Sequence, residues 1–180
     1  MGTRHFIGVI SDGKYKIANY GQFDGYIEGQ GAMILNFLSK ADLNIFRKKL
    51  NNCRFIEQSE LRQLYVNAGD VPENKSGFVT SEVAKNFSEM YPSLTREAGA
   101  HILDIVYNSI GEVPLWNRED FLSDELWCEF GYVIDMDRET LHCYRMGRHM
   151  FAEYLIADLP TVEEMQYDHD SWFRKHFNND

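Results

Sequence analysis

The features near the start of the chain that could do chemistry are a histidine, His5, and a glycine-rich stretch at residues 20–31. A glycine-rich turn that leads into a helix offers backbone N–H groups to an anion, and a nearby imidazole can move protons. This pattern keeps open a small hydrolase or nucleotide-binding enzyme. However, neither the Walker spacing nor GxGxxG in a βαβ unit is present, so we favour a structural loop. Its members are Tyr20, Gly21, Phe23, Asp24, Gly25, Tyr26, Gly29 and Gly31.

Acidic and histidine side chains give weak indications of a metal site. Asp135 and Asp137 have Asp-x-Asp spacing, but they fall where a hairpin must turn, and acids are common there. Asp24 and Glu28 supply fewer oxygens than a hard cation requires. The six histidines show neither HExxH nor a His/Cys ligand spacing. We therefore expect no metal and no cofactor.

Histidine and cysteine pairs leave one catalytic arrangement open. His5 and His142 fall in strands that we place in one sheet, so they could meet across it. Cys143 follows His142 directly, but neighbouring residues of a strand point to opposite faces, which separates a thiolate from the imidazole. The three cysteines are an odd number without CxxC spacing, which is typical of reduced thiols in the cytoplasm. We assign no catalytic residue.

Charge is divided unevenly between the two halves of the chain. Residues 1–90 hold 11 Lys and Arg against 10 Asp and Glu, whereas residues 91–180 hold 7 against 18, and the net charge is −10. A one-sided negative field attracts cationic partners and repels nucleic acid. From the densest acidic segment, residues 112–139, we predict these partner-binding residues: Glu119, Asp120, Asp124, Glu125, Glu129, Asp135 and Asp137.

A basic cluster in the first half offers a second, weaker interaction. It could contact DNA phosphates, although such clusters are more often solvated helix faces. The residues predicted for this contact are Arg47, Lys48, Lys49 and Arg54, with Lys40 and Arg62 nearby.

Strand patterns occur at both ends of the chain, and helical patterns occur between them. Asp12-Gly13 predicts a tight turn between strands at residues 4–10 and 14–20. Three more strands are predicted at 130–136, 141–146 and 151–157, and helices at 32–38, 42–50, 59–68, 81–91, 95–110 and 119–127, with a short last helix from Thr161. This order predicts an α+β fold, an antiparallel sheet of about five strands from both chain ends with a helical middle packed on one face.

The length of 180 residues suits one domain, with a soft subdivision near the turn-rich residues 70–78. No apolar run approaches the 18 residues of a membrane span, and the N-terminus lacks the apolar core of a signal peptide. We expect a cytoplasmic protein that does not enter the membrane.

Several stretches together resemble a family of small proteins found in phages, prophages and other mobile elements. They are Met1-Gly-Thr-Arg-His5, Asp12-Gly-Lys-Tyr-Lys-Ile17, Tyr20-Gly-Gln-Phe-Asp-Gly-Tyr26, Glu28-Gly-Gln-Gly31, Phe130-Gly-Tyr-Val-Ile-Asp-Met-Asp-Arg-Glu-Thr-Leu141 and Asp158-Leu-Pro-Thr161. These stretches cover both ends of the chain, and the helical middle resembles the family only in its general character. The chain also looks like a type II-A anti-CRISPR protein of gut bacteria, an inhibitor of Cas9.

The resemblance implies a protein that binds Cas9, or Cas9 with its guide RNA, in the cytoplasm of a bacterial host and blocks DNA binding or cleavage. It implies evasion of a host defence by a stoichiometric binder rather than an enzyme. It carries no residue roles with it. The charge map is compatible with this expectation, because Cas9 holds its guide–target duplex in a positively charged channel and reads the PAM with arginines.

Overall fold

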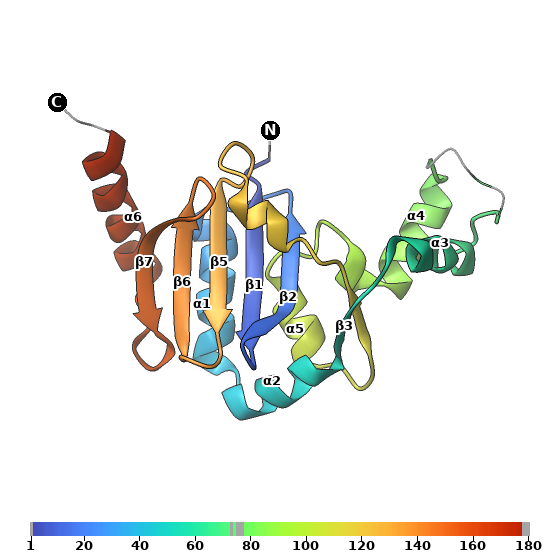
Figure 1. Cartoon of the computed structure of the whole chain (residues 1–180), viewed down its shortest axis with the longest axis horizontal. Coiled ribbons are helices and arrows are strands. Elements are labelled where there is room, and N and C mark those ends of the chain that lie inside the picture. The colour runs from blue at the N-terminus through green and yellow to red at the C-terminus, as the bar shows by residue number, and fades with distance from the viewer. Residues whose placement is uncertain (1, 73, 75–77, 178–180) are drawn as a thin grey trace.

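The computed structural model of the protein describes residues 2–72, 74 and 78–177. The fold is α+β, as predicted, with a five-stranded, mostly antiparallel sheet and six α-helices in the described residues (Figure 1). The strands of the sheet are β1 (His5–Ser11), β2 (Lys14–Gly21), β5 (Phe130–Asp135), β6 (Thr140–Arg145) and β7 (His149–Leu155). The helices are α1 (Ala32–Lys40), α2 (Leu43–Lys49), α3 (Gln58–Asn67), α4 (Ser81–Met90), α5 (His101–Tyr107) and α6 (Val162–Phe177).

The strand order is β2-β1-β5-β6-β7, so the N-terminal hairpin and the three C-terminal strands join at β1 and β5. These two central strands run parallel, which corrects the prediction of a wholly antiparallel sheet. The reason is the connection between them: a chain that leaves the first hairpin and returns through a long helical crossover can re-enter in the same direction. The other three pairings of the sheet are antiparallel.

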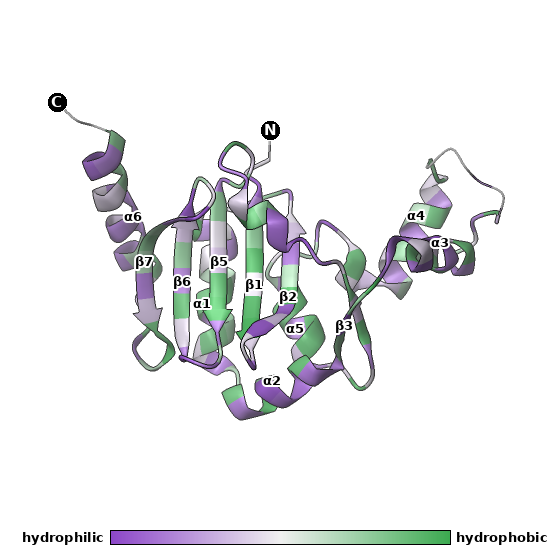
Figure 2. Ribbon diagram, in the orientation of Figure 1, coloured by the Kyte–Doolittle hydropathy of each residue, from purple (hydrophilic) through white to green (hydrophobic). Residues whose placement is uncertain are grey.

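The main core lies between the sheet and the helices behind it in Figure 1, with α1 behind β5 and β6 and α5 behind β1 and β2. Alternate residues of the central strands point into it, for example Ile7 and Val9 of β1 and Tyr132 and Ile134 of β5. Figure 2 shows these two strands as the most hydrophobic of the sheet and β7 as partly hydrophobic and partly hydrophilic.

The opposite face of the sheet carries a smaller apolar cluster, which consists of Phe6, Ala18, Leu122, Cys128 and Val133. The segment that covers it runs from residue 116 to residue 129 and includes the 3₁₀ helix η4 (Glu119–Ser123). Here we predicted an α-helix at 119–127. The 3₁₀ turn η4 forms instead, and both Leu122, within it, and Cys128, after it, pack against the sheet.

A small lobe of α3 and α4 projects away from the edge of the sheet (Figure 1). It is joined to the sheet by a parallel pair of short strands, β3 (Cys53–Phe55) and β4 (Val113–Leu115). The rings of Tyr65 and Phe87 stack at 4.1 Å within its own apolar cluster. The soft boundary predicted near 70–78 falls between α3 and α4, and its residues 73 and 75–77 lie outside the described residues.

Candidate functional site

The acidic segment at residues 116–129 is anchored by its apolar side chains. Phe121 packs edge-to-face on Tyr20 with ring centroids 4.8 Å apart. Leu122 lies over Gly131 of β5, where an added Cβ would come within 2.6 Å of its Cδ1. The absence of a side chain at Gly131 therefore lets the segment close onto the sheet and turns its carboxylates outward.

Three of the predicted partner-binding residues, Glu119, Asp120 and Glu125, are exposed on this segment. In the described part of the chain, none of the three forms an ion pair with a lysine or arginine. The imidazole Nε2 of His149 lies 3.8 Å from a carboxylate oxygen of Glu125. Exposed apolar side chains follow directly: Leu126 is 75% exposed and Trp127 46%. This surface, which we call the acidic apex (Glu119, Asp120, Glu125, Leu126 and Trp127), combines free negative charge with apolar area.

Asp124 and Glu129 flank the acidic apex and make contacts within the chain. The Asp124 Oδ1 accepts hydrogen bonds from the backbone N–H groups of Leu126, at 3.1 Å, and Trp127, at 2.9 Å. The Glu129 Oε1 accepts from the backbone N–H of Arg4 at 3.0 Å. The Arg4 guanidinium in turn lies 4.3 Å from the ring centre of Trp127. These two carboxylates thus fix the backbone that presents the apex.

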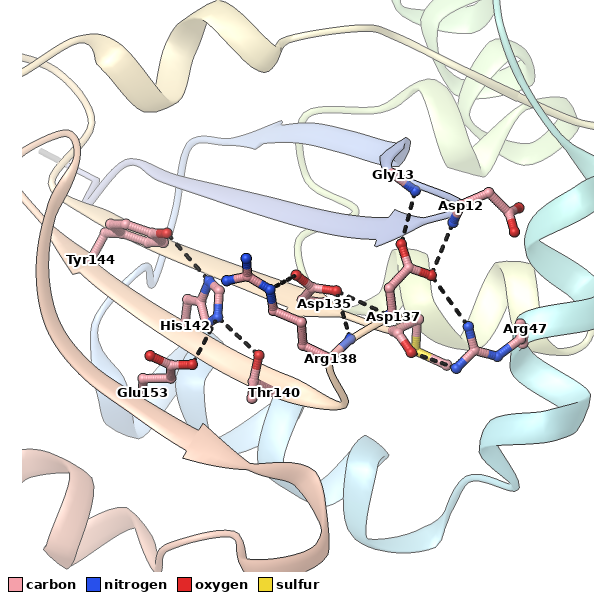
Figure 3. Close-up of polar contacts among 11 residues, drawn as sticks. Asp12, Gly13, Arg47, Asp135, Asp137, Arg138, Thr140, His142, Tyr144 and Glu153 are labelled. Atoms are coloured by element: carbon pink, nitrogen blue, oxygen red, sulfur yellow. Dashed lines mark hydrogen bonds and ion pairs between the residues drawn. The ribbon is translucent and has the colours of Figure 1, made fainter.

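Asp135 and Asp137 hold two hairpin turns together (Figure 3). The Asp135 Oδ1 accepts hydrogen bonds from the N–H groups of Asp137 and Arg138 at 2.9 and 3.0 Å, which closes the β5–β6 turn. The Asp137 carboxylate accepts from Gly13 at 2.8 Å and Asp12 at 3.0 Å, across the β1–β2 turn. The N–H groups of Gly13 and Asp12 lower the pKa of Asp137. Asp137 thus lies in the β5–β6 turn, and Asp135 ends β5 directly before it.

The predicted DNA-contacting residues are mostly engaged inside the chain. Arg47 donates to the backbone oxygen of Met136 and approaches Asp137 at 3.5 Å (Figure 3), and Lys49 donates to the backbone oxygen of Ser109. Arg54 pairs with Glu60 at 2.5 Å and with Glu112 at 2.9 Å. Lys48 is exposed, and no ion pair of it occurs among the described residues.

His142 lies in a polar row on the sheet face that faces away from α1 and α5 (Figure 3). Its Nε2 lies 2.9 Å from the Thr140 hydroxyl and 3.5 Å from a Glu153 oxygen, and its Nδ1 lies 3.4 Å from the Tyr144 hydroxyl. Burial raises the pKa of Tyr144, so this phenol stays protonated at neutral pH rather than acting as a nucleophile.

The pairing of His5 with His142 that the sequence left open does not form. His5 shares the helix-covered face with Ile7, whereas His142 shares the other face with Thr140, and β1 and β6 are separated by β5. Cys143 is buried in the main core, on the opposite face from His142, as strand alternation predicted. Burial raises the pKa of its thiol, so Cys143 is inert as a nucleophile.

His5 lies inside the glycine-rich loop rather than beside an open site. Its side chain is 1% exposed, and neither ring nitrogen has a hydrogen-bond partner among the described residues. An added Cβ on Gly21 would lie 2.1 Å from the His5 Nε2, and one on Gly25 would lie 2.7 Å from its Cβ. Burial lowers the pKa of the imidazole to about 4. The ring is neutral at pH 7 and enclosed, so it does not reach a molecule bound outside the loop.

The rest of the loop is also held from within. The Tyr132 hydroxyl, from the centre of the sheet, donates to the backbone oxygen of Gly25 at 2.9 Å. The backbone N–H of Gln30 donates to the oxygen of Asp24 at 2.9 Å, and Asp24 has a φ of 57°, in the left-handed region. Residues 27–31 form a π-helical turn, η1 (Ile27–Gly31), that leads directly into α1. Backbone N–H groups of residues 29–31 donate within this turn.

Sequence reasoning missed a cavity of about 540 Å³ between β7, the segment that follows it and α6. Its polar lining is acidic and aromatic, with Tyr154 donating to Asp168 at 2.8 Å. The spacing of Glu164, Tyr167 and Asp168, at i, i+3 and i+4 on one helix face, could have indicated it. The full lining is Tyr154, Asp158, Leu159, Pro160, Glu163, Glu164, Tyr167 and Asp168. Carboxylates and tyrosine rings of this kind suit a cationic side chain.

Among the residues that the structure describes, no three His, Cys, Asp or Glu side chains gather into a group that could hold a metal ion. Nor does this part of the chain contain a helix with the length and apolar character needed to cross a bilayer. Comparison of the chain with protein-family models, with curated proteins and with solved structures finds no match.

Proposed function

We propose that this protein is a stoichiometric inhibitor that binds Cas9, or Cas9 with its guide RNA, and blocks DNA binding or cleavage in the cytoplasm of a bacterial host. The observation that carries the proposal is the acidic apex, where Glu119, Asp120 and Glu125 face solvent without a lysine or arginine partner in the described chain. The sequence resemblance to proteins of phages and mobile elements supports the choice of partner.

The acidic apex has the composition of a protein-binding surface. Unpaired carboxylates steer a cationic partner into contact and make wrong partners unfavourable. Exposed Trp127 and Leu126 supply apolar area beside them, and buried aromatic anchors carry most of the energy of protein interfaces. Cas9 presents strongly basic surfaces around its nucleic-acid channel, so charge complementarity favours contact there.

The other predicted binding residues, and the cavity beside α6, would add to the contact made by the acidic apex. Asp124 and Glu129 hold the backbone that presents the acidic apex, whereas Asp135 and Asp137 hold the hairpin turns at the other end of β5. The acidic cavity between β7 and α6 offers a second place for a lysine or arginine of the partner. For the weak DNA contact, Lys48 and the nearby Lys40 are the exposed basic residues of the cluster.

The direct test is co-elution with a type II-A Cas9–guide RNA complex at moderate salt, followed by titration of DNA cleavage. We expect a stable complex and loss of cleavage that is complete near one inhibitor per Cas9. Failure to co-elute contradicts the proposal. Inhibition by amounts far below those of Cas9 points instead to an enzyme that turns over.

A matched pair of variants then locates the surface. E119Q/D120N/E125Q removes three charges from the acidic apex. E57Q/E82Q/D104N removes three charges from exposed acids elsewhere. We expect the first variant to lose inhibition at equimolar ratio and the second to inhibit as the native protein does. Equal inhibition by both variants excludes the apex as the contact, while leaving the Cas9 titration as an independent result.

A further inference from the structure

A second cavity, of about 180 Å³, lies at the outer edge of the sheet beside β2. The 3₁₀ turn η3 (Pro92–Leu94) with the two residues after it forms one wall, and residues 116–118 form the other. The complete lining is Asn19, Tyr20, Leu94, Thr95, Arg96, Trp116 and Arg118. This volume lies below the roughly 300–1,000 Å³ of sites for drug-sized ligands, so the cavity suits a small group.

Two arginines converge on this cavity from different segments of the chain. The Arg118 guanidinium lies 5.3 Å from the ring centre of Trp116, and no ion pair of Arg118 occurs among the described residues. The Arg96 Nε contacts a Glu97 oxygen at 3.0 Å, so its two Nη groups are the donors left for other acceptors. The half of the chain that supplies both arginines holds only 7 Lys and Arg against 18 Asp and Glu, so their convergence stands out from a negative background.

Asn19 contributes a third polar group. It lines the cavity, is 6% exposed, and its Nδ2 has no hydrogen-bond partner among the described residues. A buried amide donor left unpaired is unfavourable, and such a group calls for a partner from outside the chain. Rotation about the last side-chain bond exchanges the amide nitrogen and oxygen, so the donor can be turned toward a bound acceptor.

We propose that this cavity, the β2-edge site, binds a small oxyanion, either a phosphate or a carboxylate group. Arginine forks donate paired hydrogen bonds to both groups, and the Asn19 amide adds a neutral donor. The site is separate from the acidic apex and has the opposite charge preference. It therefore does not depend on the proposed function.

The test is an NMR titration of the ¹⁵N-labelled full chain with inorganic phosphate, with acetate and with chloride at matched ionic strength. We expect saturable shifts of the Asn19 side-chain amide and of the Arg96 and Arg118 Nε–H signals with phosphate or acetate, and none with chloride. Saturation by phosphate alone identifies a phosphate group as the ligand, and saturation by acetate alone identifies a carboxylate. Shifts that rise without saturation with every anion mean an adventitious ion only and overturn the proposal.

Variants show whether the two arginines hold the anion. R96Q/R118Q should weaken binding roughly tenfold or more, since two charge-assisted hydrogen-bonding groups are lost. The matched control R138Q removes an exposed guanidinium outside the cavity and should leave the affinity unchanged. N19L should also bind the anion more weakly. If that buried substitution prevents folding, the affinity of R96Q/R118Q alone tests the proposal. Native affinity in R96Q/R118Q overturns the proposal.

Discussion

The glycine-rich loop and the acidic apex place their polar groups in opposite ways. At the loop, the imidazole of His5 from β1 and the hydroxyl of Tyr132 from β5 are buried, and the glycines bring the loop backbone against them. In the segment that carries the apex, Leu122 and Cys128 are buried instead, and the carboxylates of Glu119, Asp120 and Glu125 are left to solvent. Both segments have an unusual composition, yet only the acidic segment exposes its ionisable side chains to solvent.

This difference separates fold-forming polar groups from groups that are free to bind. A polar side chain that is buried inside its own chain has lost its contacts with water and often hydrogen-bonds within the fold. Substitution there therefore changes stability. A charge without an internal partner contributes little to stability, so its substitution changes binding. The same division runs through the acidic region itself, where Asp135 is enclosed and Glu119 is free.

The largest effect is expected from Gly29→Ala in the loop. The new Cβ would lie 2.2 Å from the backbone oxygen of Asp24, which already accepts the hydrogen bond from Gln30 and is held in a left-handed conformation. Because this oxygen cannot retreat freely, we expect a loss of at least about 3 kcal/mol in the free energy of unfolding, measured in urea. Gly111→Ala, where no heavy atom lies within 4 Å, should change it by less than about 1 kcal/mol. Comparable losses would show that the loop is slack.

The second effect is a pH dependence that His5 imposes. Its folded pKa of about 4 lies below the unfolded value of 6.5, so the unfolded chain binds a proton more readily. The His5 contribution is complete above pH 6.5 and is lost as the pH falls toward 4, by up to about 3 kcal/mol in the free energy of unfolding. His5→Leu should remove this part of the slope between pH 7 and pH 4, whereas exposed His101→Gln should retain it. An unchanged slope in His5→Leu would contradict the enclosure of the ring.

Local chemistry in the sequence predicts much of this fold. Asp12-Gly13 forms the expected tight turn with both residues at positive φ, and Asp42 caps α2 by accepting from Asn44 and Ile45. These features depend on neighbours along the chain, so propensity is sufficient to find them.

Features that depend on distant residues could not be predicted in this way. The helix expected at 95–110 begins only at His101, because Gln30, 70 residues earlier, accepts from the N–H of Ala100 at 2.6 Å and Gly99 adopts a φ of 49°. The separation of His5 from His142 follows from strand order, which no local pattern encodes. Likewise, the density of acidic residues predicts the acidic segment, but only the folded structure distinguishes the carboxylates that bond within the chain from those that are exposed.

A moderate effect on stability is expected from Asp135→Ala. Asp135 is 8% exposed, and its Oδ1 accepts the two backbone N–H groups that close the β5–β6 turn. Loss of this charged acceptor should lower the free energy of unfolding by about 2 kcal/mol, while Asp135→Asn, which keeps one oxygen, should lose about half as much. The urea midpoints of the two variants measure the difference. Equal midpoints would mean that the carboxylate does not hold the turn.

The smallest effect on stability, and the largest on binding, is expected from E119Q/D120N/E125Q. Since these carboxylates have no lysine or arginine partner in the described chain, their neutralisation should leave the melting temperature within about 2 °C of the native value. Association with the Cas9–guide complex should slow and become less sensitive to salt, because long-range attraction acts mainly on the encounter rate. Stopped-flow association at two ionic strengths measures both changes. If the variant melts as early as Asp135→Ala, these acids belong with the enclosed ones, and the contrast between the two segments no longer separates folding from binding.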